Sequence, residues 1–161
     1  MIRLYEESDR QQVVEMIADL RVFLSRLKSR KKVPDLDAAA SELQSYLDKR
    51  FPIFVYESRE VLAGYLVCRV DEDVVWAESL FVRPKFRRQG IASSLYAEAE
   101  RLAQELGGDT VFNWVHPNNK ASISFLKKRG YGVLNLIELR RPWPGEKLTT
   151  RVQVGDDAFD Y

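Results

Sequence analysis

A short basic segment, RRQGIA at 87–92, has the composition of a site for an anion. An apolar run ends before it and a helical pattern begins after it, so the segment falls at the start of a helix. The first N–H groups of a helix lack partners within the helix and carry the positive end of its dipole, so phosphates bind there. Gly90 and Ala92 would let a ligand approach the backbone, and Arg87 and Arg88 would add positive charge. We therefore expect this segment to bind a diphosphate.

Two common phosphate motifs are excluded at this segment. No Gly-Lys-Ser/Thr follows the glycine, so it is not a Walker A loop. It also lacks the Gly-x-Gly-x-x-Gly pattern of dinucleotide-binding folds. The simpler alternative, a solvated basic loop with a glycine at a turn, stays open on these residues alone.

One carboxylate stands in the apolar run that precedes the basic segment. Glu78 lies in VVWAESLFV (74–82), and strand alternation would place its side chain on the same face as Trp76, Leu80 and Val82. A carboxylate among apolar side chains costs free energy unless it is paired or functional. Glu78 is therefore our candidate for a general base. The alternative is an exposed glutamate, or one paired with an arginine.

These residues need a sheet to position them. Strands are expected at 2–5, 53–57, 61–70, 74–82, 110–115, 131–139 and 148–154. Short polar joins make the second, third and fourth strands antiparallel neighbours. A helix between the fourth and fifth favours parallel pairing there, and the last strand is expected beside 131–139 as an edge. The order predicts one α+β (α/β layered) domain over residues 1–161, with a mixed, mostly antiparallel sheet flanked by helices.

Four helices are expected around this sheet. The first begins at Ser8, with Gln11 completing a capping box. The second follows Pro34 and is capped by Asp35 or Asp37. Its buried stripe is expected to be Leu36, Ala40, Leu43 and Leu47. The third and fourth are expected at 90–106 and 119–130.

Composition limits the function classes. With 25 Lys and Arg against 24 Asp and Glu, the formal charge is +1, which argues against a dedicated nucleic-acid binder. The single cysteine, Cys68, excludes an internal disulfide framework and fits a reducing compartment. The chain shows no signal peptide, no apolar run of membrane-spanning length and no metal-ligand spacing. We expect a cytoplasmic protein that binds neither membrane nor metal.

Two motifs together resemble the GNAT superfamily of N-acetyltransferases. That family has Arg/Gln-x-x-Gly-x-Gly/Ala after its fourth strand, and this sequence supplies Arg87, Gly90 and Ala92. The apolar run that leads into this motif is matched by Val82, Pro84 and Phe86. The family's second motif is matched downstream, in NKASISFLKKRGY, by Asn119, Ser122, Gly130 and Tyr131. The expected order of elements is also similar to the GNAT fold, in which the fourth and fifth strands splay apart.

The resemblance implies a cofactor, acetyl-CoA, and a set of residues that contact it. Its diphosphate would be held by backbone N–H groups from about Arg88 to Ala92, which include Gln89, Gly90 and Ile91. Its pantetheine arm would pair with the main chain of Leu80, Phe81 and Val82, and a backbone N–H near the last two would serve the oxyanion. Asn119, Ser122 and Phe125 would contact the cofactor at the second motif. The reaction would be direct attack of a primary amine on the acetyl thioester, in a ternary complex, with Glu78 as base.

Several features leave alternatives open. Many family members have a tyrosine as general acid where this sequence has Leu126, so a non-catalytic CoA-binding or regulatory module of the same fold is the competing hypothesis. His116 could orient the acceptor, although a structural role is favoured for a histidine beside a proline. Cys68 is interpreted as a core residue. The acceptor is expected to be a small-molecule amine or a protein amine, and family members often form homodimers.

Overall fold

The computed structural model describes residues 1–161. They form two compact units, Met1–Trp114 and Val115–Tyr161, which are described separately below.

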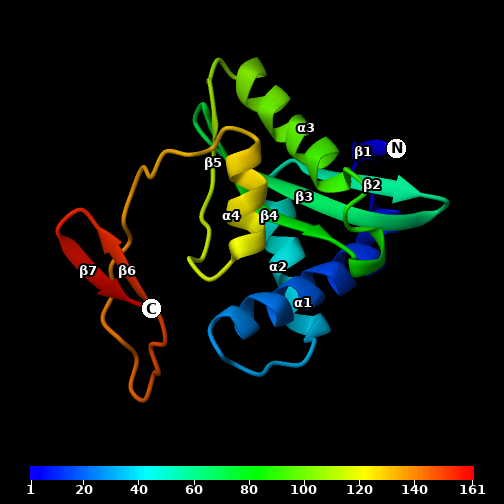
Figure 1. The fold of residues 1–161 in the computed structure, drawn as a ribbon. Helices are drawn as coiled ribbons and strands as arrows, with labels where there is room; N and C mark the ends of the chain where they lie inside the picture. The colour runs from blue at the N-terminus through cyan, green and yellow to red at the C-terminus, as the bar shows by residue number, and fades with distance from the viewer. The chain divides into compact units, whose positions relative to one another are not determined.

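The first unit is built on a five-stranded sheet in the order β1-β2-β3-β4-β5 (Figure 1). The strands are β1 Ile2–Leu4, β2 Ile53–Ser58, β3 Val61–Asp71, β4 Val74–Val82 and β5 Val111–Phe112. Neighbours from β1 to β4 are antiparallel, whereas β4 and β5 are parallel. The predicted mixed, mostly antiparallel sheet is therefore confirmed.

Helices cover both faces of this sheet. They are the short helix η1 Glu7–Asp9, α1 Arg10–Leu27, α2 Leu36–Asp48, η2 Pro84–Phe86 and α3 Ile91–Glu105. Figure 1 shows α1 and α2 on one face of the sheet and α3 on the other. The main core lies under α1 and α2 and includes Tyr65 and Val67 of β3 and Phe81 of β4. A Cβ on Gly64 would instead meet Val82 and Leu95, so these two side chains belong to the α3 face.

The start of the first helix differs from the prediction. Ser8 is not its cap, because a 3-10 turn precedes α1. The Asp9 carboxylate accepts the backbone N–H of Glu6 at 2.9 Å and two bonds from Arg3, at 2.6 and 2.9 Å. The buried Asp9 thus organises this turn and ties it to β1, which displaces the expected Ser8–Gln11 box.

The second helix begins as expected, but its buried stripe was wrong in part. Asp35 caps α2 by accepting the backbone N–H of Ala38 at 2.9 Å. The buried residues are Ala39, Leu43 and Tyr46, whereas Leu36 is 53% exposed. The packing against α1 and the sheet is centred on Leu43, which turns Leu36 toward solvent.

The second unit contains α4 Lys120–Lys128 and a hairpin of β6 Arg151–Val154 with β7 Asp157–Asp160. The predicted strand at 131–139 was wrong, and β6 does not pair with it. Gly155 adopts φ +59° in the two-residue turn between β6 and β7, a conformation that suits a tight hairpin. Pairing across this turn closes a much shorter loop than pairing with 131–139. No helix in the chain is both long and apolar enough to cross a membrane.

Candidate active site

One edge of β4 is open where the strand approaches the basic segment. The register of β4 with β5 ends at Trp76↔Phe112, although β4 continues to Val82. On its other side β4 stays paired with β3, and the Arg83 N–H donates to the Ala63 carbonyl at 2.9 Å. Because backbone groups alternate along a strand, those of Phe81 then face β3 and those of Leu80 and Val82 face the open side. The splay expected at the fourth and fifth strands is therefore present.

The early end of β5 has a local cause. Asn113 follows the strand directly, and its Nδ2 donates to the Val111 carbonyl at 3.0 Å. The same nitrogen lies 2.8 Å from the hydroxyl of Tyr96, a buried residue of α3. Asn113 thus turns toward α3 rather than extending the strand. We missed this pair in the sequence, since nothing local links Tyr96 to Asn113.

Glu78 lies at a β-bulge. Val67 pairs with Ser79 and Cys68 pairs with Ala77, which leaves Glu78 as the extra residue of β4. A bulge breaks the alternation of side chains, so the expectation that Glu78 shares one strand face with Leu80 and Val82 was wrong. The physical reason is this shift in register, which depends on β3.

The carboxylate of Glu78 is directed to the α1–α2 face. Its Oε2 lies 3.8 Å from Nη1 of Arg69, and its side chain is 24% exposed. Its charge also acts on Tyr46 of α2, whose pKa is raised by burial, by its hydrogen bond to Glu42, and to a smaller extent by Glu78. The alternative that Glu78 pairs with an arginine is therefore realised, and both side chains of the pair are largely covered.

Arg69 itself is part of an aromatic cluster. Its Cζ lies 4.7 Å from the centroid of Trp76 and 4.5 Å from that of Trp114. Asp71 Oδ2 lies 3.1 Å from Arg69 Nε. We missed this cluster in the sequence, where an arginine in an apolar run was the only available signal, because it depends on the pairing of Arg69 with Trp76.

The basic segment forms a cradle at the start of α3. Arg88 and Gly90 have positive φ angles, +64° and +80°, on either side of Gln89. Left-handed residues in such a turn aim successive N–H groups into one concavity, which suits an anion. An added Cβ at Gly90 would meet nothing within 4 Å, so the space beside its backbone is open. An arginine in a left-handed conformation is strained, which is typical of functional loops.

Arg87 connects this cradle to the open edge of β4. Its Nε donates to the Val82 carbonyl at 2.9 Å, and its guanidinium lies 5.5 Å from the Phe81 ring centroid. Gln89 is held by a longer bond from its side chain to the Lys85 carbonyl, at 3.3 Å. Arg87 therefore fixes the loop in place, in addition to contributing charge.

The second predicted motif lies in the second unit. Asn119 is buried and caps α4, since its Oδ1 accepts the Ser122 N–H at 3.2 Å. Phe125 lies on the same helix, 5.9 Å from the guanidinium of Arg129. Leu126 is buried and offers no hydroxyl, so no acid stands at the family's usual position.

The remaining candidates have structural roles. His116 Nδ1 accepts the backbone N–H of Asn118 at 3.1 Å, which supports the structural interpretation of this histidine. Cys68 is fully buried. Burial, followed by the charge of Glu98, raises the pKa of its thiol to about 12, which makes it a poor nucleophile.

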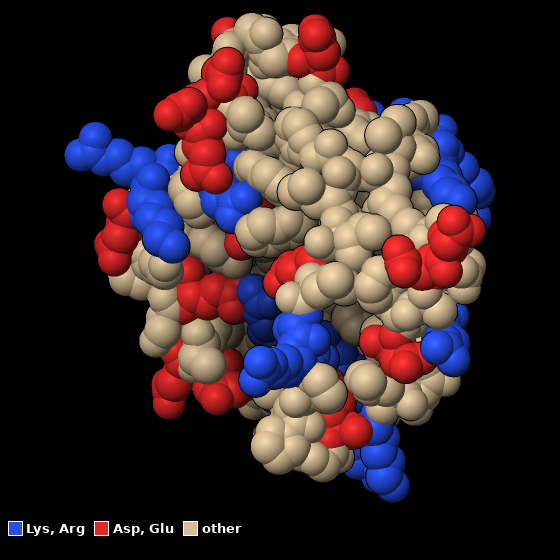
Figure 2. All heavy atoms as spheres, turned by 90° about the vertical axis from the view of Figure 1, so that its left-hand side faces the viewer, with Lys and Arg blue, Asp and Glu red and all other residues tan.

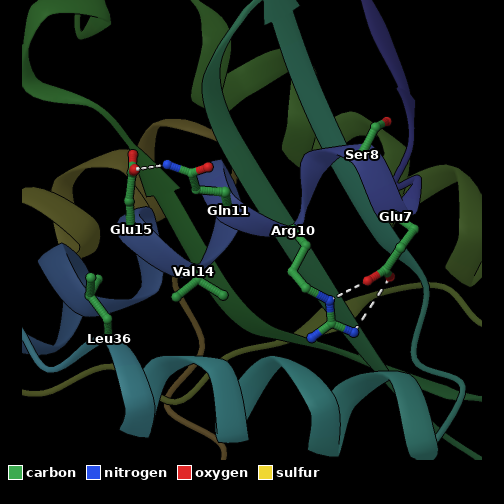
Figure 3. A pocket seen from close by; sticks show the side chains of 7 residues that line it. All are labelled: Glu7, Ser8, Arg10, Gln11, Val14, Glu15 and Leu36. Carbon is green, nitrogen blue, oxygen red and sulfur yellow. Dashed lines mark hydrogen bonds and ion pairs between the residues drawn. The ribbon is translucent and has the colours of Figure 1, made fainter.

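A shallow hollow of about 390 Å³ lies elsewhere in the first unit, where the starts of α1 and α2 meet (Figure 3). Figure 3 shows the Glu7–Arg10 and Gln11–Glu15 pairs at its rim and Val14 and Leu36 among its lining residues. The residues of β4 and of the cradle are not part of it. It offers no catalytic group beyond carboxylates that are already paired.

Charged side chains of both signs intermingle on the face shown in Figure 2. Acidic and basic groups alternate there without a large area of one sign. This mixture on the face shown agrees with the near-neutral formal charge of +1.

Comparison with known proteins identifies the family. The acetyltransferase (GNAT) family matches residues 15–131. An uncharacterised N-acetyltransferase of Methanocaldococcus jannaschii is 31% identical over 85 residues, and the match covers 48% of this chain but only 38% of that relative.

Two solved structures are similar in fold. One is aminoglycoside acetyltransferase AAC(6')-Iy in complex with a CoA bisubstrate analogue, which is 20% identical with a TM-score of 0.69 over 89% of this chain and 97% of the other. The other is AAC(6')-IG of Acinetobacter haemolyticus, 14% identical with a TM-score of 0.71 over 89% and 98%. These two similarities concern the fold, and the match of the family over residues 15–131 shows that the chain belongs to the acetyltransferase (GNAT) family.

Proposed function

We propose that this protein transfers an acetyl group from acetyl-CoA to a primary amine by direct attack in a ternary complex. The observation that carries the proposal is the continuity of two features of the first unit. The open edge of β4 ends at Val82, and the chain passes through η2 directly into the cradle at Gly90. A ligand with a diphosphate at one end and an amide-bearing arm at the other matches this arrangement.

The cradle would hold the diphosphate. The N–H groups from Arg88 to Ala92, which include those of Gln89, Gly90 and Ile91, are the donors at the start of α3. The Leu80 carbonyl and the Val82 N–H would bind the pantetheine arm, as an added strand would bind, whereas the Val82 carbonyl already accepts Arg87 Nε. Phe81 would contribute by packing instead, because its backbone faces β3. Asn119, Ser122 and Phe125 are proposed as further contacts from α4.

Acetyl-CoA supplies an acetyl group that is already activated as a thioester. The amine must be neutral to attack it, and we assign the Glu78 carboxylate as the acceptor of the amine proton. The Arg69 contact keeps this carboxylate in place beside the open edge. The Leu80 N–H, on the open side of β4 and nearer to Glu78, is the preferred donor to the developing oxyanion, since the Phe81 N–H faces β3 and the Val82 N–H is assigned to the pantetheine arm.

The acceptor is proposed to be a small molecule. Both solved structures described above are aminoglycoside acetyltransferases, and their similarity in fold favours a small-molecule amine over a protein acceptor.

The test is a screen of amines with acetyl-CoA, in which free thiol release and acetylated product are both measured. We expect Glu78→Gln to lower kcat by about 10²-fold to 10⁴-fold, the usual contribution of a general base. The Kd for CoA should stay the same, because Glu78 is not part of the cradle. Tight CoA binding without acetylation of any amine would contradict the proposal and favour a non-catalytic binding module.

A further inference from the structure

Arg69 packs against aromatic rings beside the proposed base. Its guanidinium packs against the rings of both Trp76 and Trp114, whose centroids are 5.0 Å apart. Trp76 is also in contact with Phe112 of β5, at 5.1 Å between centroids. The Arg69 side chain is only 19% exposed. Stacking on aromatic rings fixes the plane of a guanidinium without using its N–H donors.

Those donors are poorly used within the protein. Arg69 Nε is buried and has no hydrogen bond. Asp71 lies close to it, at 3.1 Å, but is not aligned to accept its proton. Glu78 lies 3.8 Å from Nη1, which is too long for a hydrogen bond. A buried donor without an acceptor is costly and rare, so this guanidinium is suited to a ligand that supplies an acceptor.

A carboxylate is the ligand group that fits best. Its two oxygens match the fork of a guanidinium and form short, charge-assisted bonds. Asp71 is 59% exposed and stands at the end of β3, so an incoming carboxylate would compete only with a weakly held side chain. Trp114, which packs against Arg69, is also exposed.

The neighbouring charges fix the orientation of such a ligand. Glu78 and Asp71 are both negative, so a lone carboxylate would be repelled from the cluster. An acceptor that carries an amine and a carboxylate close together avoids this repulsion when its amine is directed to Glu78 and its carboxylate to Arg69. The same orientation would deliver the amine to the proposed base.

We propose that Arg69, packed against Trp76 and Trp114, binds a carboxylate of the acceptor, and that the acceptor is an amino acid with its primary amine one or two carbons from the carboxylate. This inference rests on the proposed function and narrows its acceptor class.

The test compares amino acids with the amines that lack only the carboxylate, in the acetylation assay. The ratio of their kcat/KM values should be about tenfold to hundredfold in favour of the amino acid, which is the effect of one charge-assisted pair. Arg69→Lys keeps the charge but loses the fork, and this ratio should fall toward one. Arg101→Lys, at an exposed ion pair on α3, is the control and should leave the ratio unchanged.

A second variant should strengthen the binding of amino acids instead of weakening it. Asp71→Asn removes the competing carboxylate and should lower KM for amino acids. Asp71 is exposed, so this substitution should leave the fold intact. The inference can then be tested even if Arg69→Lys fails to fold. An unchanged or raised KM would contradict the competition that the inference assumes.

Tryptophan fluorescence separates failure of this inference from failure of the proposed function. Binding of an amino acid beside Trp76 and Trp114 should change the emission in the presence of CoA, and the matched amine should do so only at higher concentration. A carboxylate-dependent change without any acetylation would sustain the inference while overturning the proposed function. Acetylation with equal kcat/KM for both members of each pair would overturn the inference alone.

Discussion

Replacement of Gly90 by alanine should weaken CoA binding more than it weakens the fold. Gly90 precedes α3 with φ +80°, and a Cβ added there meets no atom within 4 Å. The substitution therefore causes no clash within the protein. It places a methyl group in the open space where the diphosphate of CoA is proposed to approach the backbone.

The two effects differ in size. A non-glycine residue in the left-handed region costs about 1 to 2 kcal/mol of folding free energy, which is small against about 5 to 15 kcal/mol of total stability. Loss of one charge-assisted bond to the diphosphate costs about 1.5 to 3 kcal/mol. Because about 1.4 kcal/mol corresponds to a tenfold change, Kd for CoA should rise roughly tenfold to hundredfold.

Gly107 provides the matched control. It lies just beyond the other end of α3, has φ +85°, and an added Cβ there also meets nothing within 4 Å. Gly107→Ala should cost the same stability as Gly90→Ala and leave Kd unchanged. Isothermal titration with CoA and urea unfolding of both variants measure the two quantities. Equal Kd values for both variants would refute the assignment of the cradle.

Three further outcomes are expected. Burial raises the pKa of Asp9, but the bonds from Arg3 and the Glu6 N–H outweigh it and lower the pKa overall. The ionised Asp9 carboxylate therefore stabilises the folded protein above the unfolded pKa, about 3.9. This contribution to stability is lost as the pH falls through the pKa of Asp9 in the folded protein. Asp9→Asn should cost about 2 kcal/mol at pH 7 and flatten the loss of stability in acid, which urea unfolding between pH 2 and 7 measures. An unchanged acid response would contradict this. Tyr96→Phe removes the hydroxyl bonded to Asn113 and should cost about 1 kcal/mol in thermal or urea unfolding. Arg87→Ala removes a positive charge and also the bond that holds the loop to the Val82 carbonyl. Kd for CoA should therefore rise more in Arg87→Ala than in Arg88→Ala, which removes only an exposed charge. Titration with CoA at two salt concentrations measures both values.

The connection from β4 to α3 could be predicted from the sequence because its signals are local. An apolar run, Pro84 and Gly90 define the end of the strand and the start of the helix without reference to the rest of the chain. A cap residue acts over only a few residues, so Asp35 could be named as one of two candidate caps of α2, whereas Asn119 was expected to contact the cofactor and not to cap α4.

Features that depend on distant partners could not be predicted in this way. The bulge at Glu78 arises from the register with β3, and the contact of Arg69 with two tryptophans requires β3, β4 and the segment after β5 to be in place. The apolar pattern of 131–139 suggested a strand, but a strand also needs a neighbour, and β6 pairs with β7 instead. Asp9 displaced the expected cap because Arg3, from β1, holds it.

The central claim is that CoA binds to the open edge of β4 as an added strand and ends in the cradle. Amide hydrogen exchange, followed residue by residue with and without CoA, tests it most directly. We predict that CoA protects the amides of Leu80, Val82 and Gly90, whereas those of Ser79 and Phe81, which already face β3, change little. Unchanged exchange at Leu80 and Val82 under saturating CoA would contradict this account.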